Sequence, residues 1–248
     1  MTTASMPTST RRVQRVRHEL RRRDLQVLRT EPLGPGFVAI TFGGESLADF
    51  VSLGFDDHVK FMLPGETPEA EPVRRDYTPR RFDAARRELT IEFALHGHGA
   101  ASDWARQARP GDSATIGGPR GSMVVPTDYD WHLLVGDATA LPAVHRRLEE
   151  LPAGTRAVVR LLVAEADRRA LTSEATLDLQ WLDTPDQLLQ ALQAQALPSG
   201  EGFAWAAGEA ATMARVRDLL LVERGHPKES ARISAYWRAG TSSFHEDL

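Results

Sequence analysis

A change of rhythm near residue 126 constrains the fold of this chain more than any other feature. Before it, short runs of alternating apolar and polar residues are separated by turn residues, as in Glu88–His96, which is typical of antiparallel strands. After it, apolar runs alternate with helix-like segments. Because parallel strands need crossover connections, the second pattern predicts a mainly parallel sheet with helices on its faces.

We therefore predict two domains in the 248 residues: a six-stranded antiparallel β-barrel over 20–127 and a mainly parallel α/β domain over 128–248. A closed barrel is favoured because closure removes exposed strand edges. The segment 126–130 is the expected connection between the domains. The expected barrel strands are Leu25–Arg29, Phe37–Phe42, His58–Leu63, Arg74–Thr78, Leu89–Leu95 and Ser113–Ile116.

The second domain is expected to consist mainly of strands that alternate with helices. Its ligands should lie beyond the carboxyl ends of the strands, as in other open parallel sheets. The expected strands are Trp131–Val135, Arg156–Val163, Leu177–Leu182, Phe203–Ala207 and Arg232–Trp237, and the expected helices are Pro142–Leu151, Asp186–Leu197 and Ala210–Glu223.

The first 30 residues are strongly basic, with eight arginines against Glu19 and Asp24, although the whole chain has a net charge of −4. This segment has no aromatic residues and no recognition motif, so we interpret 1–19 as a mobile or surface-lying leader. The overall negative charge gives no reason to expect nucleic-acid binding. No apolar run is long enough for membrane insertion, so we expect a cytoplasmic protein.

Cysteine is absent, which excludes disulfides, thiolate catalysis, iron–sulfur clusters and thiol-ligated zinc. Lys60 and Lys228 are the only lysines among 30 basic residues, so Schiff-base chemistry has few possible positions, whereas arginine is plentiful for phosphate recognition. Any redox chemistry must therefore use a bound organic cofactor.

The segment Arg75-Asp76-Tyr77-Thr78-Pro79-Arg80 carries the clearest cofactor signal. A flavin dinucleotide needs an arginine fork for its pyrophosphate, a flat amphipathic ring against its ribityl chain or ring system, and a small hydroxyl near the flavin N5. The segment supplies all three groups in order. The alternative is an exposed edge strand in which Pro79 ends the ladder and the arginines are solvated.

A second segment, 96–104, places a glycine turn between a strand and a short helix, where free backbone N–H groups attract an anion. The candidate cofactor contacts in it are His96, Gly97, Gly99, Ala101, Ser102 and Trp104. A histidine metal pair has no partner ligand nearby, so cofactor contact or ordinary turn chemistry is favoured, and no metal ligand is predicted.

Two further loops complete the candidate site. The run 117–122 is too rich in turn residues for a strand interior, so we expect a loop near the domain junction, with Arg120 and Ser122 facing the cofactor. The run 137–142 follows the first strand of the second domain and offers Asp137 and Thr139 at a helix start, where ordinary helix capping is the alternative interpretation.

Together these segments resemble the siderophore-interacting protein family of FAD-dependent ferric-siderophore reductases, which is related in architecture to ferredoxin–NADP reductases. The resemblance covers about 15–248. It depends on six motifs in order: Arg75-x-Tyr77-Thr78-x-Arg80, His96-Gly97-x-Gly99-x-Ala101-Ser102-x-Trp104, Gly118-Pro119-Arg120-Gly121, Gly136-Asp137-x-Thr139-Ala140-Leu141-Pro142, Ala207-Gly208-Glu209 and Tyr236-Trp237-Arg238-x-Gly240.

The resemblance implies that FAD is held by Arg75–Arg80 and by the 96–104 loop, with Thr139 and Ala140 beside its ring. Asp137, Glu209 and Trp237 would then lie near the nicotinamide or the electron acceptor. Ala138 stands where the family often has glutamate, which leaves the choice between NADH and NADPH open. Ala100 replaces a common proline and should matter little.

The function implied by the resemblance is electron transfer from NADH or NADPH through FAD to a ferric siderophore, by a monomer that needs no catalytic side chain. Two alternatives remain open at this point. One is an NAD(P)H:flavin or ferredoxin-type reductase with a different acceptor. The other is a flavin- and siderophore-binding protein without turnover.

Overall fold

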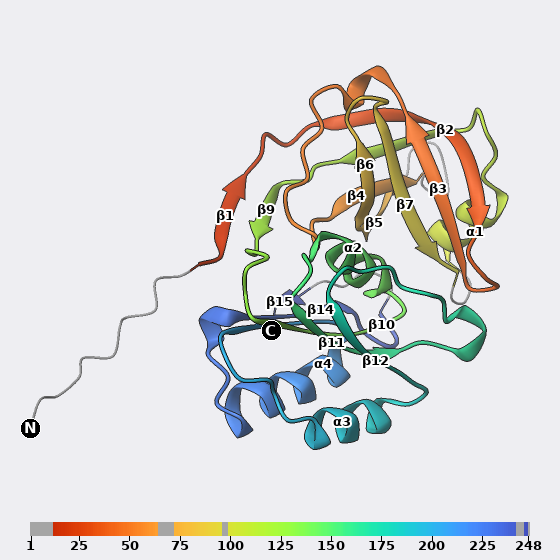
Figure 1. The fold of residues 1–248 in the computed structure, drawn as a ribbon. Coiled ribbons are helices and arrows are strands. Elements are labelled where there is room, and N and C mark those ends of the chain that lie inside the picture. Colours follow the sequence, from red (N-terminus) through yellow and green to blue (C-terminus); the bar gives the residue numbers. More distant parts are fainter. Residues whose placement is uncertain (1–11, 64–71, 96–98, 242–245, 248) are drawn as a thin grey trace, which may run out of the picture.

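The computed structural model describes residues 12–63, 72–95, 99–241 and 246–247. Two domains are stacked with the antiparallel sheet above the parallel one and helix α2 between them (Figure 1). This confirms the predicted order of a β domain followed by an α/β domain. Within the described residues, no helix combines the length and the apolar character needed to cross a bilayer.

The first domain is a curled antiparallel sheet of seven strands, in the order β5-β4-β8-β2-β3-β7-β6, rather than the six that we predicted. Helix α1 (Ala100–Gln107) packs against β7 and β3. The strands are β2 (Arg22–Pro32), β3 (Phe37–Gly43), β4 (Val59–Leu63), β5 (Val73–Tyr77), β6 (Pro79–Asp83), β7 (Glu88–Ala94) and β8 (Ser113–Gly117).

The extra strand, β6, begins at Pro79. In the alternative interpretation of the sequence, Pro79 ended the hydrogen-bond ladder of an exposed edge strand. A proline can open a strand because the first position does not need its N–H for the ladder. Here Pro79 pairs with Ile91 of β7, and the register shifts between Pro79 and Arg81. Strands β5 and β6 are the two edge strands of the curled sheet, and only Thr78 separates them in the sequence.

A separate two-stranded ribbon lies beside the barrel (Figure 1). It pairs β1 (Gln14–Arg17), within the predicted leader, with β9 (Gly121–Val124). The expectation of a loop over 117–122 is therefore wrong at both ends, because Gly117 ends β8 and Gly121 begins β9. Turn residues suit this ribbon, since a side chain on Gly121 would meet the Val16 carbonyl at 2.6 Å.

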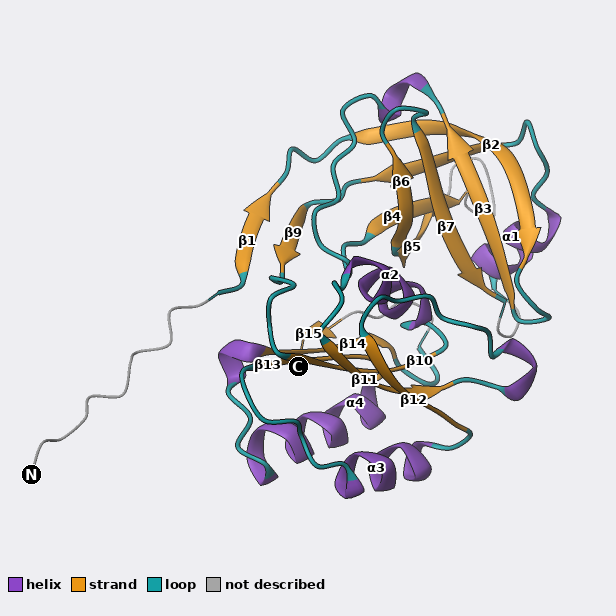
Figure 2. Cartoon of the chain, in the orientation of Figure 1, coloured by secondary structure: helices purple, strands orange, loops and turns teal. Residues whose placement is uncertain are grey.

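The second domain has the sheet order β12-β11-β10-β13-β14-β15, with the first five strands parallel. Helices α3 (Pro185–Ala194) and α4 (Ala210–Arg217) cover the outer face, and α2 (Leu141–Glu150) covers the face toward the barrel (Figure 2). The strands are β10 (Trp131–Asp137), β11 (Arg156–Leu162), β12 (Thr176–Leu182), β13 (Gly202–Glu209), β14 (Ala231–Trp237) and β15 (Glu246–Asp247).

Hydrophobic packing explains why α2 joins the two domains. Strand β10 is buried on both faces, as expected for a central parallel strand. Leu134 packs toward α2 in a cluster that also contains Phe37 and Phe55 of the barrel domain, whereas Leu133 packs toward the outer helices. Helix α2 thus packs between the parallel sheet and residues of the barrel domain, and it holds the two domains together.

His132 of β10 is fully buried, and neither ring nitrogen has a hydrogen-bond partner in the described structure. Burial, with nearby Arg147 and Arg12, lowers the pKa of His132 to about 3. An unfolded histidine, with a pKa of about 6.5, binds a proton that the folded one rejects, so stability falls as the pH drops from 6.5 toward 3.

We expect His132→Leu to remove this acid sensitivity. At pH 5 the wild-type histidine costs about 2 kcal/mol of unfolding free energy that is absent at pH 7.5. Urea unfolding at both pH values should therefore show a smaller pH-dependent loss in the variant. An equal loss in the two proteins would contradict the assignment to His132.

Candidate functional site

A pocket of about 240 Å³ lies between the two domains and gathers the strongest predicted residues. We call it the interdomain pocket. Strand β5 and the residue after it supply one wall, and the start of α2 together with β14 supplies the other. Its lining residues are Phe37, His58, Arg75, Asp76, Tyr77, Thr78, Glu92, Ala94, Ala138, Thr139, Pro142 and Tyr236.

Tyr77 and Thr78 are fixed by their surroundings. The Tyr77 ring packs against Phe93 at 4.4 Å and Phe61 at 6.0 Å between centroids. Burial raises the pKa of Tyr77 to about 12, so its hydroxyl remains a hydrogen-bond donor at neutral pH. Thr78 is buried at the junction of β5 and β6. The pocket therefore presents a flat ring and a small hydroxyl in fixed positions.

Asp76 adds an acceptor that sequence reasoning did not assign. Its Oδ2 accepts a hydrogen bond from Lys60 Nζ at 2.7 Å. Its Oδ1 is buried and has no hydrogen-bond partner within the described part of the chain. A buried acceptor without a partner is costly unless a bound group satisfies it, so this atom favours a ligand that carries hydroxyl or N–H donors.

A second cluster forms where β10, β13 and β14 end. Asp137 Oδ1 accepts from the Thr139 hydroxyl at 2.6 Å, and Asp137 Oδ2 accepts from Trp237 Nε1 at 2.8 Å and from the Glu209 backbone N–H at 2.9 Å. Gly208 permits this approach, because a side chain there would lie 2.6 Å from Asp137 Oδ2. The predicted residues Asp137, Thr139, Glu209 and Trp237 are thus brought together.

Ala140 lies beneath this cluster and not in the pocket lining. It is fully buried at the start of α2, and a Cβ added to Gly136 would lie 2.4 Å from the Ala140 Cβ. These small residues let the helix start approach β10 closely. Ala138 and Thr139, in the turn before α2, are the residues that reach the pocket.

The residues of the α1 segment lie outside the pocket lining. Ala101 is buried in the barrel core, and the Trp104 ring packs on Phe61 at 4.8 Å between centroids. Gly99 precedes the helix, and no atom of the described residues lies within 4 Å of a Cβ built on it. The Ser102 hydroxyl donates to the Ala94 carbonyl at 3.4 Å. The candidates His96 and Gly97 lie outside the described residues.

Arg80 is not part of the pocket lining and joins the two domains. It is 5% exposed, and it donates two hydrogen bonds to the Glu149 carboxylate of α2 at 2.7 and 2.9 Å. Its Nε lies 3.2 Å from Glu92 of β7, which also pairs with Arg169 after β11. All of its charge partners are protein carboxylates, so the structure gives Arg80 a role in domain docking.

Arg120 and Ser122 line a different cavity of about 710 Å³, which we call the basic groove. Ser122 is buried, donates to Asp57 at 2.6 Å and lies 2.8 Å from His18 Nε2, and burial raises the pKa of Asp57. The groove is lined by Arg15, Val16, Arg17, His18, Leu20, Asp56, Asp57, His58, Arg120, Gly121, Ser122, Met123 and Arg232.

The charge of the groove is distinctive because most arginines of this chain are paired with carboxylates. Arg15, Arg17 and Arg120 form no ion pair within the described residues, although all three line the groove. His58 lines both the groove and the interdomain pocket. The basic groove therefore borders the interdomain pocket at His58.

Comparison with known proteins decides the family. The siderophore-interacting protein model matches 129–240, and the siderophore-interacting FAD-binding domain model matches 26–70 and 66–123. An NADPH-dependent ferric-chelate reductase of Escherichia coli is 40% identical over 247 residues, which span 91% of this chain and 96% of the relative. The chain belongs to the siderophore-interacting protein family.

Two other members show how far the similarity extends. A siderophore utilization protein from T. fusca has a solved structure that covers 94% of this chain and 98% of its own, with a TM-score of 0.86 and 34% identity. A ferric vibriobactin reductase of Vibrio cholerae is 27% identical over 250 residues, spanning 90% of this chain and 92% of the relative. The match thus extends over both domains.

The interdomain pocket of this family member fits part of a flavin dinucleotide. Arg75 offers a charged donor, Tyr77 an aromatic face, and Asp76 Oδ1 a buried acceptor that lacks a protein partner. Its volume is below the roughly 300 to 1,000 Å³ of pockets that enclose a whole ligand, so it suits the ring portion of FAD. No three His, Asp or Glu side chains of the described residues gather as a metal site.

The structure brings some of the predicted residues into the interdomain pocket, together with others to which sequence reasoning gave no role. The resemblance motif included Tyr236 without giving it a role, yet this residue lines the interdomain pocket beside Thr139. His58 was assigned only to a strand, and the structure starts β4 one residue later, at Val59. Glu92 could not have been found, because its place depends on the packing of β7 against the second domain.

Proposed function

We propose that this chain is an FAD-dependent ferric-siderophore reductase, which takes electrons from NADH or NADPH and delivers them to iron(III) held by a siderophore. The observation that carries the proposal is His58, which lines both the flavin-sized interdomain pocket and the basic groove. Donor and acceptor sites are thus adjacent. The names of the Escherichia coli and Vibrio cholerae relatives support the same reaction.

Each part of the interdomain pocket has a proposed task toward FAD. Arg75 binds the pyrophosphate, Tyr77 lies against the ribityl chain or ring, and Thr78 donates a hydroxyl hydrogen bond at the ring edge, which Thr139 borders. When bound, FAD accepts a hydride from a reduced nicotinamide and passes its electrons on one at a time. The protein supplies position and electrostatics, so no side chain is required as an acid or base.

The nicotinamide is proposed to approach the cluster at the carboxyl ends of β10, β13 and β14, the usual ligand edge of a parallel sheet. Trp237 is 41% exposed there, and its indole is held by Asp137. Ala138 contributes no charge at this edge. The sheet edge therefore offers an aromatic surface and a fixed carboxylate to the incoming donor.

The ferric chelate is proposed to bind in the basic groove, where Arg15, Arg17 and Arg120 attract its negative charge. Hard oxygen ligands hold iron(III) more tightly than iron(II), so one-electron reduction releases the metal. We also propose that the protein works as a monomer in the cytoplasm. Light scattering of the FAD-loaded protein would test the monomer.

Anaerobic stopped-flow absorbance at the flavin band tests the proposed reaction. We expect NADPH or NADH to bleach the FAD-loaded protein, and a ferric siderophore to restore the colour while an iron(II) trap develops. Bleaching that no ferric chelate reverses would indicate a different acceptor. Protein that neither nicotinamide bleaches would be a binding protein without turnover.

The basic groove gives a prediction about charge. We expect the double variant Arg17→Gln/Arg120→Gln to lower the second-order rate constant for reoxidation by an anionic chelate about tenfold at low salt, because steering is lost. The difference should shrink as salt is raised. Arg156→Gln is the matched control, since Arg156 is exposed at the start of β11 and outside the groove lining. If Arg156→Gln lowers this rate constant as much as the double variant does, the assignment is contradicted.

A further inference from the structure

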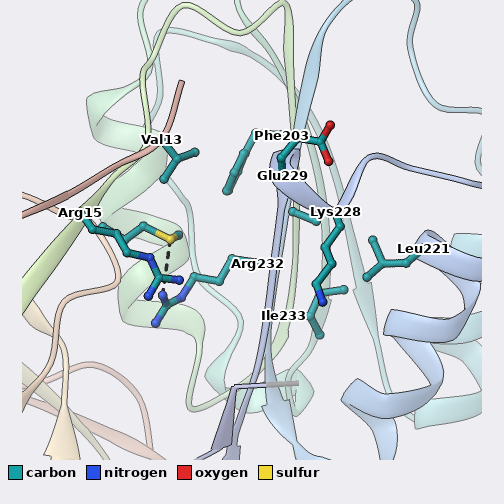
Figure 3. A pocket seen from close by; sticks show the side chains of 10 residues that line it. Val13, Arg15, Phe203, Leu221, Lys228, Glu229, Arg232 and Ile233 are labelled. Carbon is teal, nitrogen blue, oxygen red and sulfur yellow. Dashed lines mark hydrogen bonds between the residues drawn. The ribbon is translucent and has the colours of Figure 1, made fainter. Parts of the chain in front are cut away.

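A third cavity, of about 370 Å³, lies beside the β1–β9 ribbon, and we call it the ribbon pocket (Figure 3). It is lined by residues at β1 and β9, by the starts of β13 and β14, and by the helical segments Asp218–Glu223 and Lys228–Ser230 that precede β14. These elements lie at the amino ends of the parallel strands, opposite the nicotinamide edge. Its lining residues are Val13, Arg15, Met123, Phe203, Leu221, Lys228, Glu229, Ala231, Arg232 and Ile233.

The ribbon pocket continues the basic groove. Both cavities are lined by Arg15, Met123 and Arg232. The groove in turn shares His58 with the interdomain pocket. The three cavities are thus linked in series through shared lining residues. A ligand with its iron near His58 can therefore extend along the basic groove, past Arg232, into the ribbon pocket.

Arg232 is held rigidly where the two cavities meet. Its Nε lies 2.8 Å from Asp56 Oδ2, a carboxylate that also accepts from Trp205 Nε1 at 2.9 Å, and both partners are buried. One of its terminal nitrogens contacts the Met123 sulfur at 3.4 Å. In Figure 3, Arg15 lies beside Arg232 at one side of the pocket, while Lys228 extends from another side.

The lining combines an apolar floor with a small excess of positive charge. Phe203 and Ile233 are buried below the pocket, and Arg15 and Lys228 form no ion pair within the described residues. The lining carries three cations, Arg15, Lys228 and Arg232, against one carboxylate, Glu229. Arg232 is paired with Asp56 outside the lining, so the charge left uncompensated is +1. A single carboxylate on an apolar group matches this lining better than a doubly charged phosphate.

We propose that the ribbon pocket binds a carboxylate-bearing apolar arm of the ferric chelate, remote from the iron-binding groups. This rests on the proposed function. The site favours acceptors whose organic framework carries such an arm over acceptors of the same iron environment that lack it. Lys228 and Arg15 bind the carboxylate, and the apolar floor covers the group that bears it.

The two lysines of the chain allow a direct binding test that needs no electron transfer. Reductive methylation with ¹³C-formaldehyde keeps both charges and labels Lys60, Lys228 and the amino terminus. We expect 2-naphthoate added to the FAD-loaded protein to shift the Lys228 signal and leave Lys60 as an internal reference, because Lys60 is paired with Asp76. The neutral 2-naphthalenemethanol should shift Lys228 far less.

Two variants sharpen this test. Lys228→Gln should raise the dissociation constant of 2-naphthoate about fivefold, the size expected for losing one exposed ion pair. Leu221→Asp should weaken it further by placing a like charge in the pocket. Equal shifts of both lysines, no shift at all, or equal binding of the neutral alcohol would overturn the carboxylate site.

The link to the acceptor is tested with two ferric hydroxamate chelates that differ only in an aryl carboxylate arm. In single-turnover reoxidation of the reduced wild-type protein, the armed chelate should have the higher second-order rate constant. Lys228→Gln should reduce the ratio of the two constants about fivefold. An unchanged ratio would overturn the arm assignment even if 2-naphthoate binds, whereas failure of both chelates to reoxidise the protein would count against the proposed function instead.

Discussion

Replacing Arg75 by glutamine is expected to raise the dissociation constant of FAD about 100-fold, because one charge-assisted contact to a phosphate contributes about 2 to 3 kcal/mol. The purified variant should be nearly colourless after gel filtration. Its unfolding temperature without FAD should match the wild type, since the only bond found for its guanidinium among the described residues is to the Arg74 carbonyl. Flavin fluorescence titration measures the effect.

Arg74→Gln is the matched control for this variant. Arg74 precedes Arg75 on β5 but is exposed and outside the lining of the interdomain pocket. It should therefore load with FAD normally. If Arg75→Gln binds FAD as tightly as the wild type does, another residue binds the pyrophosphate, and the proposed role of Arg75 is wrong.

Arg80→Gln, in contrast, is expected to lower stability strongly and to affect FAD binding little. Removing one partner of a buried ion pair costs about 3 to 5 kcal/mol, and Glu92 keeps Arg169, so we expect about 3 kcal/mol. For a protein of this size that corresponds to a fall of about 6 to 12 °C in unfolding temperature. Differential scanning fluorimetry with and without FAD measures it.

Arg81→Gln is the control that separates the stability contribution of a buried ion pair from that of an exposed one. Arg81 contacts the same Glu149 carboxylate at 3.1 Å, but its side chain is 67% exposed, so the loss should stay below about 1 kcal/mol. A variant at Arg80 that loses FAD without losing stability would restore the cofactor role implied by the family resemblance.

Residue pattern alone predicted most of the fold, because the periodicities of the two domains are local properties. The alternation in 88–96 corresponds to β7, where Leu89, Ile91 and Phe93 are fully buried. The helix expected at Pro142 begins at Leu141. Strand β6 was missed because Pro79 followed by two arginines has neither the alternation nor the propensity of a strand.

The site was predictable where its residues are adjacent in sequence and not where folding brings them together. Arg75, Tyr77 and Thr78 were found as one motif, and they line one pocket. Arg80 belongs to the same motif, but its partner Glu149 lies 69 residues away, so its burial could not be inferred. The roles of these residues toward FAD remain predictions until they are measured.

The pairing of β1 with β9 has a practical consequence for anyone who prepares this protein. An arginine-rich stretch of this kind is a common target for deletion before crystallisation. A version shortened to begin at residue 20 would keep all seven strands of the barrel sheet, yet it would lack Arg15, Arg17 and His18 from the groove. Such a sample could look well folded and yellow while giving misleadingly weak kinetics with iron chelates.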